Sequence, residues 1–153
     1  MLFRSEVPLS ASAHLPLYVL IAEDSPAFAF VINAMVQRLG HRAQVVGDGE
    51  QAVAAYRENS LDVILMDVQM PVVNGLEATR QIRTIEAQKE SVGAARIPII
   101  GLSAFAQQSD VDSALAAGMS DYLTKPVNLE ILRGLFERLD RKSTRLNSSH
   151  IPL

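Results

Sequence analysis

The sequence of 153 residues contains no cysteine, which excludes a disulfide-stapled scaffold, a thiolate zinc site and a cysteine nucleophile. It has no apolar run near the ~18 residues that a membrane helix requires. A signal peptide fits poorly, because the small residues 11–13 precede the apolar stretch 15–22 instead of following it. A basic face for nucleic acid is also missing, since residues 1–140 carry 11 basic and 17 acidic side chains, a net charge of −6. We therefore expect a soluble, cytoplasmic protein that contacts neither membrane nor nucleic acid directly.

The chain does contain a regular alternation of apolar segments. Hydrophobic residues make up 48% of it, enough for the core of one domain. Short apolar runs predict five strands, at Tyr18–Ala22, Ala43–Val46, Val63–Met66, Ile97–Leu102 and Asp121–Leu123. Apolar side chains at helical spacing predict five helices, which begin after Ser25, Gly49 and Gly75 and then cover Val111–Ala117 and Leu129–Leu139. A polar connector precedes the fourth strand, at Glu86–Arg96.

Strands that alternate with helices in this way predict a parallel sheet with helices on both faces. In such sheets, ligands bind outside the carboxyl ends of the strands. Glu23 and Asp24 follow the first predicted strand, Asp67 the third, Ser103 the fourth and Lys125 the fifth. We therefore expect three carboxylates, one hydroxyl and one ammonium to meet at one edge of the sheet.

The side chains of this predicted cluster are of types that suit a metal ion and a phosphoryl group. Carboxylates that are brought together repel one another, so a cation must hold them. Mg²⁺ suits the set, because it prefers few carboxylates, several waters and a phosphate oxygen. The hydroxyl and the ammonium are donors that suit the oxygens of a phosphoryl group. The combination indicates metal-assisted phosphoryl transfer.

Taken singly, each of these features has a structural explanation. Glu23 and Asp24 could be loop carboxylates or charges at a helix start. Lys125 with the proline after it could mark a turn, and Ser103 could be a hydrogen-bonded hydroxyl at a strand end. Their coincidence at the ends of different strands favours the functional interpretation.

Four motifs in the correct order and spacing resemble the receiver domain of two-component response regulators. They are Ile21–Pro26, Leu65–Gly75, Ile99–Ala104 and Ala116–Pro126. The likeness runs from about Leu17 to Leu139. The sequences of two segments, DVQMPVVNGLEATRQIR and AAGMSDYLTKP, are similar to those of receivers attached to hybrid sensor histidine kinases. The long connector before the fourth strand is similar too.

The resemblance implies a flavodoxin-like (CheY-like) fold, a doubly wound five-stranded parallel sheet in the order 2-1-3-4-5 with five helices. It implies that Asp67 is the phosphoacceptor and receives a phosphoryl group from a phosphohistidine. It further implies a Mg²⁺ ion that Asp24 contacts directly together with Asp67. Glu23 would act mostly through metal-bound water, and the backbone carbonyl of Gln69 would complete the protein ligands.

The resemblance also assigns a switch. Lys125 would pair first with the acceptor carboxylate and then with the phosphoryl group, after a cis peptide bond to Pro126. Ser103 would move to bond a phosphoryl oxygen and Tyr122 would swing inward behind it, which would alter the face formed by the last two helices and the fifth strand. Most family members have threonine at the position of Ser103, and serine keeps the hydroxyl. Phe105 and Gln69 lie where they could affect hydrolysis of the phosphoaspartate.

The implied partner is a histidine kinase or a histidine phosphotransfer domain, and the domain would catalyse only its own phosphorylation and dephosphorylation. A phosphatase or phosphotransferase with an aspartyl intermediate is a second reading. It is disfavoured, because such enzymes usually place the nucleophile after the first strand, with a second acid two residues on, and carry a cap insertion. A pseudo-receiver that only binds is a third reading, but it would lack one of the site residues.

The two ends of the chain fit no part of this pattern. The segment 141–153 is polar, lacks periodicity and resembles a translated sequencing adapter or cloning scar, as does the start of the chain. We therefore predict a receiver domain at residues 17–140, with flexible or non-native termini at 1–16 and 141–153.

Overall fold

The computed structural model describes residues 15–89 and 96–150. Within these residues, five parallel strands form a single sheet in the order β2-β1-β3-β4-β5. Their bounds are β1 Tyr18–Ala22, β2 Arg42–Val46, β3 Val63–Asp67, β4 Ile99–Ser103 and β5 Asp121–Thr124. This order confirms the predicted doubly wound topology, which leaves a crevice at the carboxyl ends of β1 and β3, where the direction of winding reverses.

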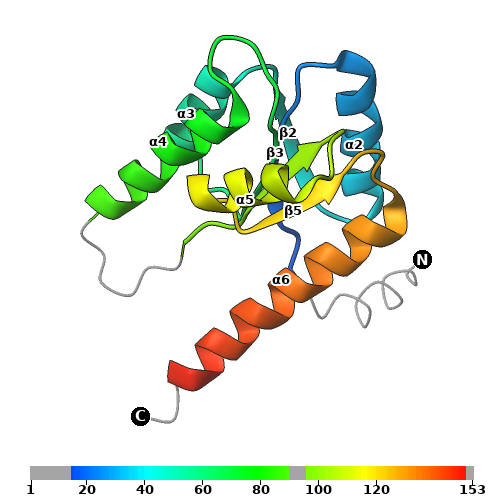
Figure 1. The fold of residues 1–153 in the computed structure, drawn as a ribbon. Coiled ribbons are helices and arrows are strands. Elements are labelled where there is room, and N and C mark those ends of the chain that lie inside the picture. The colour runs from blue at the N-terminus through cyan, green and yellow to red at the C-terminus, as the bar shows by residue number, and fades with distance from the viewer. Residues whose placement is uncertain (1–14, 90–95, 151–153) are drawn as a thin grey trace.

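Over the same part of the chain, five helices cover both faces of the sheet (Figure 1). Their bounds are α2 Pro26–Arg38, α3 Gly49–Glu58, α4 Gly75–Gln88, α5 Gln108–Ala117 and α6 Leu129–His150. Side chains of α3, α4 and α5 form one core with the sheet, and those of α2 and α6 form a second core on the opposite face. The predicted flavodoxin-like α/β class is therefore confirmed.

Side chains of the central strand β3 lie in both cores, because successive side chains of a strand point to opposite faces. Val63 and Leu65 lie in the core with α2 and α6, whereas Ile64 and Met66 lie in the core with α3, α4 and α5. All five residues of the strand are buried. Asp67 is therefore a carboxylate at the end of an otherwise apolar, buried strand.

Local contacts fix where two helices begin beside this edge of the sheet. Ser25 caps α2, with its Oγ accepting a hydrogen bond from the amide of Phe28, and Asn74 caps α4 in the same way. Gly75 lets α4 start directly against β3, because a Cβ here would lie 2.1 Å from the carbonyl oxygen of Asp67. Both helices therefore start next to the predicted site.

α4 is longer than the sequence predicted. It continues to Gln88, past the expected start of the polar connector at Glu86. The Glu86 carboxylate pairs with Arg83 at 2.8 Å and accepts a hydrogen bond from the Ile97 amide over 2.7 Å. The last turn of the helix is therefore tied to the segment that leads into β4, which a search for apolar periodicity does not detect.

Two other boundaries also differ. α5 starts at Gln108 and not at Val111, because the Asp110 carboxylate accepts a hydrogen bond from the amide of residue 107 and so closes a polar first turn. β4 starts at Ile99, two residues later than expected. Pro98 has no amide hydrogen for the strand ladder, although its carbonyl oxygen accepts a hydrogen bond from β3.

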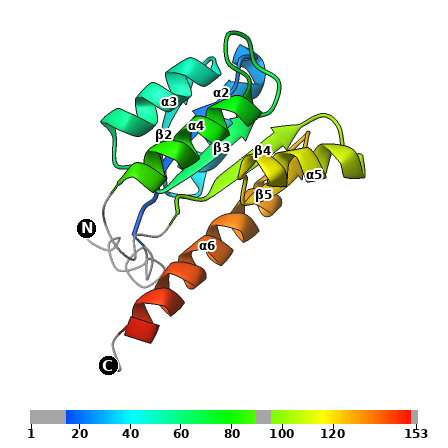
Figure 2. The same cartoon turned by 60° about the vertical axis from the view of Figure 1, so that its left-hand side comes forward.

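α6 runs to His150, and its last turns extend away from the sheet (Figure 2). The backbone of residues 141–150 continues this helix, which the lack of apolar periodicity there did not predict, and a flexible or non-native terminus at 141–153 stays a prediction. The physical reason for the continued helix is that no glycine or proline lies between Gly134 and Pro152 to break it. Residues 1–14 and 151–153 lie outside the described part, and the domain limits 17–140 stay a prediction. None of the helices that the structure describes combines the length and the hydropathy of a membrane-spanning segment.

Candidate functional site

Three carboxylates that the sequence placed after two different strands meet at the carboxyl edge of the sheet. Glu23 and Asp24 follow β1 and Asp67 ends β3, and these strands are neighbours. One oxygen of each carboxylate lies within 4.8 Å of the other two. Glu23 and Asp67 are each only 3% exposed, whereas Asp24 is exposed. The cluster is therefore a buried acidic pair with a third carboxylate on its solvent side.

Lys125 neutralises part of this charge. Its Nζ lies 3.0 Å from Oε1 of Glu23 and 3.4 Å from Oδ2 of Asp67. The peptide bond from Lys125 to Pro126 is cis, as the resemblance implied. One ammonium among three carboxylates leaves an excess of negative charge, which favours the binding of a further cation.

An unsatisfied oxygen in the buried pair fits the same conclusion. The two carboxylate oxygens of Glu23 differ, because Oε2 accepts a hydrogen bond from the amide of Ser25 over 3.0 Å, whereas the buried Oε1 accepts none from the described residues. Its contact with Lys125 at 3.0 Å is an ion pair without hydrogen-bond alignment. The Lys125 ammonium compensates part of the charge on this oxygen, and a bound cation would engage it further. Together with the carboxylates of Asp24 and Asp67, this oxygen gives the all-oxygen donor set that hard divalent cations take.

The same crowding changes the acidity of Asp67. Burial, followed by the neighbouring Glu23 carboxylate, raises the pKa of Asp67 from 3.8 to about 7. The amide of Gln69, which donates to Oδ1 over 3.2 Å, and the Lys125 ammonium act in the opposite direction. In the absence of a metal ion, Asp67 is therefore partly protonated at neutral pH, and a bound cation would favour the carboxylate.

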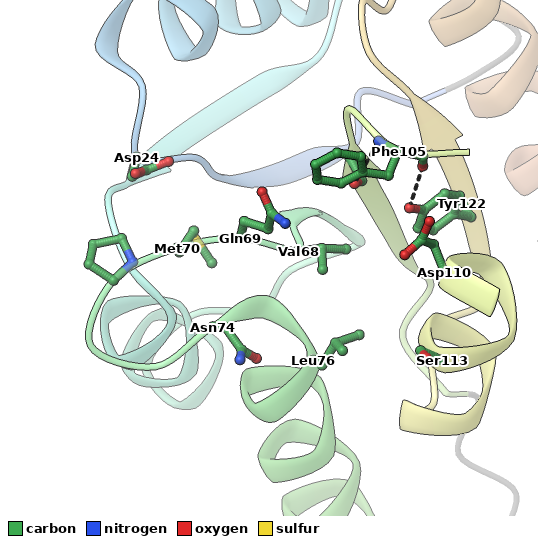
Figure 3. A pocket seen from close by; sticks show the side chains of 12 residues that line it. Asp24, Val68, Gln69, Met70, Asn74, Leu76, Phe105, Asp110, Ser113 and Tyr122 are labelled. Carbon is green, nitrogen blue, oxygen red and sulfur yellow. Dashed lines mark hydrogen bonds between the residues drawn. The ribbon is translucent and has the colours of Figure 1, made fainter. Parts of the chain in front are cut away.

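A cavity of about 660 Å³ opens beside the acidic cluster. Asp24, Gln69, Ser103, Phe105 and Tyr122 are among the residues that line it. In Figure 3, Asp24 lies on one side of the cavity and Phe105 and Tyr122 lie on the other, with Gln69 between them. The residues predicted for the switch therefore share this cavity with two of the predicted metal ligands, Asp24 and Gln69.

The predicted switch residues are linked through Phe105. Ser103 is only 3% exposed, and its Oγ accepts a hydrogen bond from the Phe105 amide over 3.1 Å. The Tyr122 hydroxyl donates to the Phe105 carbonyl oxygen over 2.7 Å (Figure 3). The carbonyl oxygen of Ser103 accepts a hydrogen bond from the Lys125 amide over 2.8 Å. The end of β4 thus contacts Lys125, and the loop that follows it contacts Tyr122.

Sequence reasoning missed one residue at this site. The ring of Phe28, in the first turn of α2, lies with its centroid 4.5 Å from Nζ of Lys125. The sequence identified Phe28 only as one of the apolar residues at helical spacing. Its position four residues after Asp24 is the signal that could have placed it at the carboxyl edge.

Comparisons with known proteins show to which family the chain is similar. Residues 19–137 match the family model described as the response regulator receiver domain. "Hybrid signal transduction histidine kinase I" of Dictyostelium discoideum is 38% identical over 131 residues, which cover 82% of this chain and 7% of that protein. "Sensor protein GacS" of Pseudomonas syringae pv. syringae is 35% identical over 125 residues, which cover 82% of this chain and 13% of that protein. The chain thus spans a small part of these relatives.

Two solved structures are similar as well. The receiver domain of a sensor histidine kinase from Pseudomonas aeruginosa, with a magnesium ion in its active site cleft, is 40% identical with a TM-score of 0.71, covering 82% of this chain and 98% of that one. The second is the receiver domain of a Saccharomyces cerevisiae response regulator, co-crystallised with a histidine phosphotransfer signaling protein. It is 36% identical with a TM-score of 0.71, and the match covers 76% of this chain and 83% of that one. With the family model matching most of the chain and the predicted residues gathered at one edge of the sheet, this protein belongs to the response regulator receiver domain family.

Proposed function

We propose that this chain accepts a phosphoryl group on the carboxylate of Asp67 and so acts as the receiver of a two-component His-to-Asp phosphorelay. The observation that carries the proposal is the buried Asp67 carboxylate, which faces a second carboxylate and the ammonium of Lys125 at the end of β3. A structural ion pair needs one carboxylate, and this site brings three together.

The transfer itself is a displacement at phosphorus. A carboxylate oxygen of Asp67 attacks the phosphorus of a phosphohistidine, and the P–N bond breaks as the new P–O bond forms. The electron pair of the broken bond stays on the imidazole nitrogen, which takes up a proton. The Lys125 ammonium and the Ser103 hydroxyl are preorganised donors for the phosphoryl oxygens.

We assign Mg²⁺ to the acidic cluster. Asp24 and Asp67 would hold it directly, Glu23 through a metal-bound water, and the carbonyl oxygen of Gln69 would complete the protein ligands. When bound, Mg²⁺ neutralises negative charge on the transferring group. The unsatisfied Oε1 of Glu23 and the magnesium ion in the similar Pseudomonas aeruginosa receiver domain support this assignment.

The switch would use the loop after β4. On phosphorylation, Ser103 would exchange the Phe105 amide for a phosphoryl oxygen, and Tyr122 would leave the Phe105 carbonyl oxygen and turn inward. Both present contacts pass through Phe105, so a movement of this residue affects both side chains. The change would reach the face formed by α5, β5 and α6, which adjoins this loop.

The partner would be a histidine kinase or a histidine phosphotransfer domain. The similarity to hybrid histidine kinases and to a receiver co-crystallised with a phosphotransfer protein supports this choice. The domain would be no enzyme toward other molecules, since the group that it transfers ends on its own side chain.

Incubation with Mg²⁺ and acetyl phosphate, followed by intact-mass measurement, tests the proposal. We expect the wild-type chain to gain the mass of one phosphoryl group and Asp67→Asn to gain none, because an amide is no nucleophile toward phosphorus. Asp112→Asn is the matched control and keeps the label, since this carboxylate is exposed on α5. Full labelling of Asp67→Asn, at a site other than a neighbouring hydroxyl, would contradict the assignment.

A further inference from the structure

The ammonium of Lys125 has a third neighbour that the chemistry proposed above does not use. Besides the Glu23 and Asp67 carboxylates, the ring of Phe28 lies close to it, with its centroid 4.5 Å from Nζ. Phe28 belongs to the first turn of α2, whereas Lys125 follows β5. Two segments far apart in the sequence therefore bring an aromatic ring and a cation together beside the acceptor carboxylate.

We propose that Phe28 is a positioning residue for Lys125, with its ring holding the ammonium toward the carboxylates of Glu23 and Asp67. This inference rests on the function proposed above for Asp67. An aromatic face attracts a cation through the quadrupole of the ring. It presents no oxygen that would compete with a phosphoryl group for the N–H donors. The ring therefore restrains the ammonium without adding an oxygen acceptor beside the acceptor carboxylate.

Lys125 needs such a restraint. A lysine side chain is a flexible stem with a compact charge, and ordering it costs conformational entropy. Its contact with the unsatisfied Oε1 of Glu23 has no hydrogen-bond alignment and gives little direction. The side chain is 23% exposed, so water has access to it. The ring occupies space that water would otherwise share and narrows the positions that the ammonium can take.

A packing role for Phe28 is the competing explanation. The side chain is partly buried and packs against the core formed with α2 and α6. A residue that only packs would lower stability when it is shortened, and the effect would not depend on the charge of Lys125. A positioning residue would lower the phosphorylation rate only while that ammonium is present.

A double-mutant cycle separates the two explanations. Phe28→Leu keeps an apolar side chain and removes the ring, and Phe28→Tyr keeps the ring. With Mg²⁺ and limiting acetyl phosphate, we expect Phe28→Leu to label Asp67 about 3- to 10-fold more slowly than wild type and Phe28→Tyr to stay within about 2-fold, given the usual strength of such contacts. In the Lys125→Ala background, Phe28→Leu should cause no further loss. Thermal unfolding of each variant shows that it is folded at the assay temperature.

A spectroscopic measurement without phosphodonor makes the test independent of Asp67. The ε-methylene protons of Lys125 should show an upfield ring-current shift in the NMR spectra of wild type and Phe28→Tyr, and Phe28→Leu should lose it. A wild-type labelling rate in Phe28→Leu, an equal loss in the Lys125→Ala background, or no ring-current shift in the wild type would overturn the proposal. A wild-type chain that is not labelled at all would overturn the function proposed for Asp67, and the ring-current shift would still decide whether the contact exists.

Discussion

Two partly buried cations, Arg83 and Lys125, lie near opposite ends of the strands and are held in different ways. The guanidinium of Arg83 donates hydrogen bonds to the carbonyl oxygens of Gly118 and Ile97, each over 2.8 Å. It also pairs with the Glu86 carboxylate at 2.8 Å. Its donors are directed at fixed acceptors from several segments, so Arg83 fastens α4 to the connections before β4 and β5.

Among the residues that the structure describes, Lys125 has no comparable set of acceptors. Its ammonium approaches two carboxylates at 3.0 and 3.4 Å and an aromatic ring, and one of those carboxylate oxygens accepts no hydrogen bond from the described residues. A satisfied cluster of this size stabilises one conformation, whereas an unsatisfied one retains interactions for a ligand. The difference distinguishes a structural ion pair from a candidate binding site without reference to any relative.

Replacing the two cations should give the largest contrast in stability. Arg83→Met removes three hydrogen bonds to part-buried acceptors and should lower the free energy of unfolding by about 3 kcal/mol. Lys125→Met should change it by less than about 1 kcal/mol in chelator, because Asp67 can take up a proton. Urea denaturation measures both, with Arg80→Met as the control for an exposed ion pair, expected within about 0.5 kcal/mol of wild type. Equal losses for Arg83→Met and Lys125→Met would break the comparison.

The burial of Asp67 beside the Glu23 carboxylate should make the free energy of unfolding depend on pH. Because the pKa of Asp67 is raised to about 7 in the folded state, the folded chain binds more protons than the unfolded chain between about pH 4 and 7. The free energy of unfolding in chelator therefore falls as the pH rises through this window. Asp67→Asn cannot ionise and should be more stable than wild type by about 2 kcal/mol at pH 8.

That gain should disappear as the pH is lowered toward 4, where the wild-type carboxyl is protonated as well. Denaturation curves at several pH values measure it. Asp112→Asn, which replaces an exposed carboxylate on the surface of α5, should show no such pH-dependent gain. A gain for Asp67→Asn that is the same at pH 4 and pH 8 would mean that ionisation is not its cause.

Measured Mg²⁺ affinities should distinguish the direct ligand Asp24 from Glu23, which would act through water. Asp24→Ala should weaken Mg²⁺ binding by about tenfold or more, and Glu23→Ala by less, because a direct ligand loses more than one that acts through water. Titration calorimetry gives both affinities. Removing one of the repelling carboxylates should leave the melting temperature of Asp24→Ala in chelator level or raised. Equal Mg²⁺ affinities in both variants and wild type would contradict the assigned roles.

The smallest effect is expected at the far end of α6. The α6 residues of the second core, among the side chains that the structure describes, are Leu132, Leu135, Phe136 and Leu139. A chain truncated after Arg141 keeps all of them, so its free energy of unfolding should stay within about 0.5 kcal/mol of the full chain, with an unchanged phosphorylation rate. A clear loss of stability would show that residues 142–153 pack on the domain, and their interpretation as a scar would fail.

Much of the site could be predicted because it depends on chain direction. Parallel strands end at one edge of a sheet, so placing Glu23, Asp24 and Asp67 after two strands was enough to bring them together. The same rule brought Ser103 and Lys125 to this edge. That these residues lie close to one another follows from the topology.

The parts that could not be predicted depend on side-chain packing between distant segments. The apolar period of α2 marks Phe28 as a buried residue and does not show that a lysine after β5 lies against its ring. The period of α4 likewise ends before Glu86, although that carboxylate extends the helix by pairing with Arg83 and the Ile97 amide. The length of α6 was missed for a related reason, since a helix can continue without an apolar face when no residue breaks it.

The close approach of Gly75, the first residue of α4, to the backbone of Asp67 makes these two positions differ in how they tolerate substitution. The atoms that a side chain at Gly75 would strike are backbone atoms of Asp67 and Val68, at 2.1 to 2.9 Å. Any other residue there must displace the main chain that carries the acceptor carboxylate. A lineage that loses signalling could exchange Asp67 and keep a folded domain, whereas exchange of Gly75 would disturb the fold itself. Asp67 and Gly75 adjoin at the Asp67 backbone and are therefore under different kinds of selection. At Asp67 selection acts on the phosphoacceptor chemistry, and at Gly75 it acts on the backbone fold.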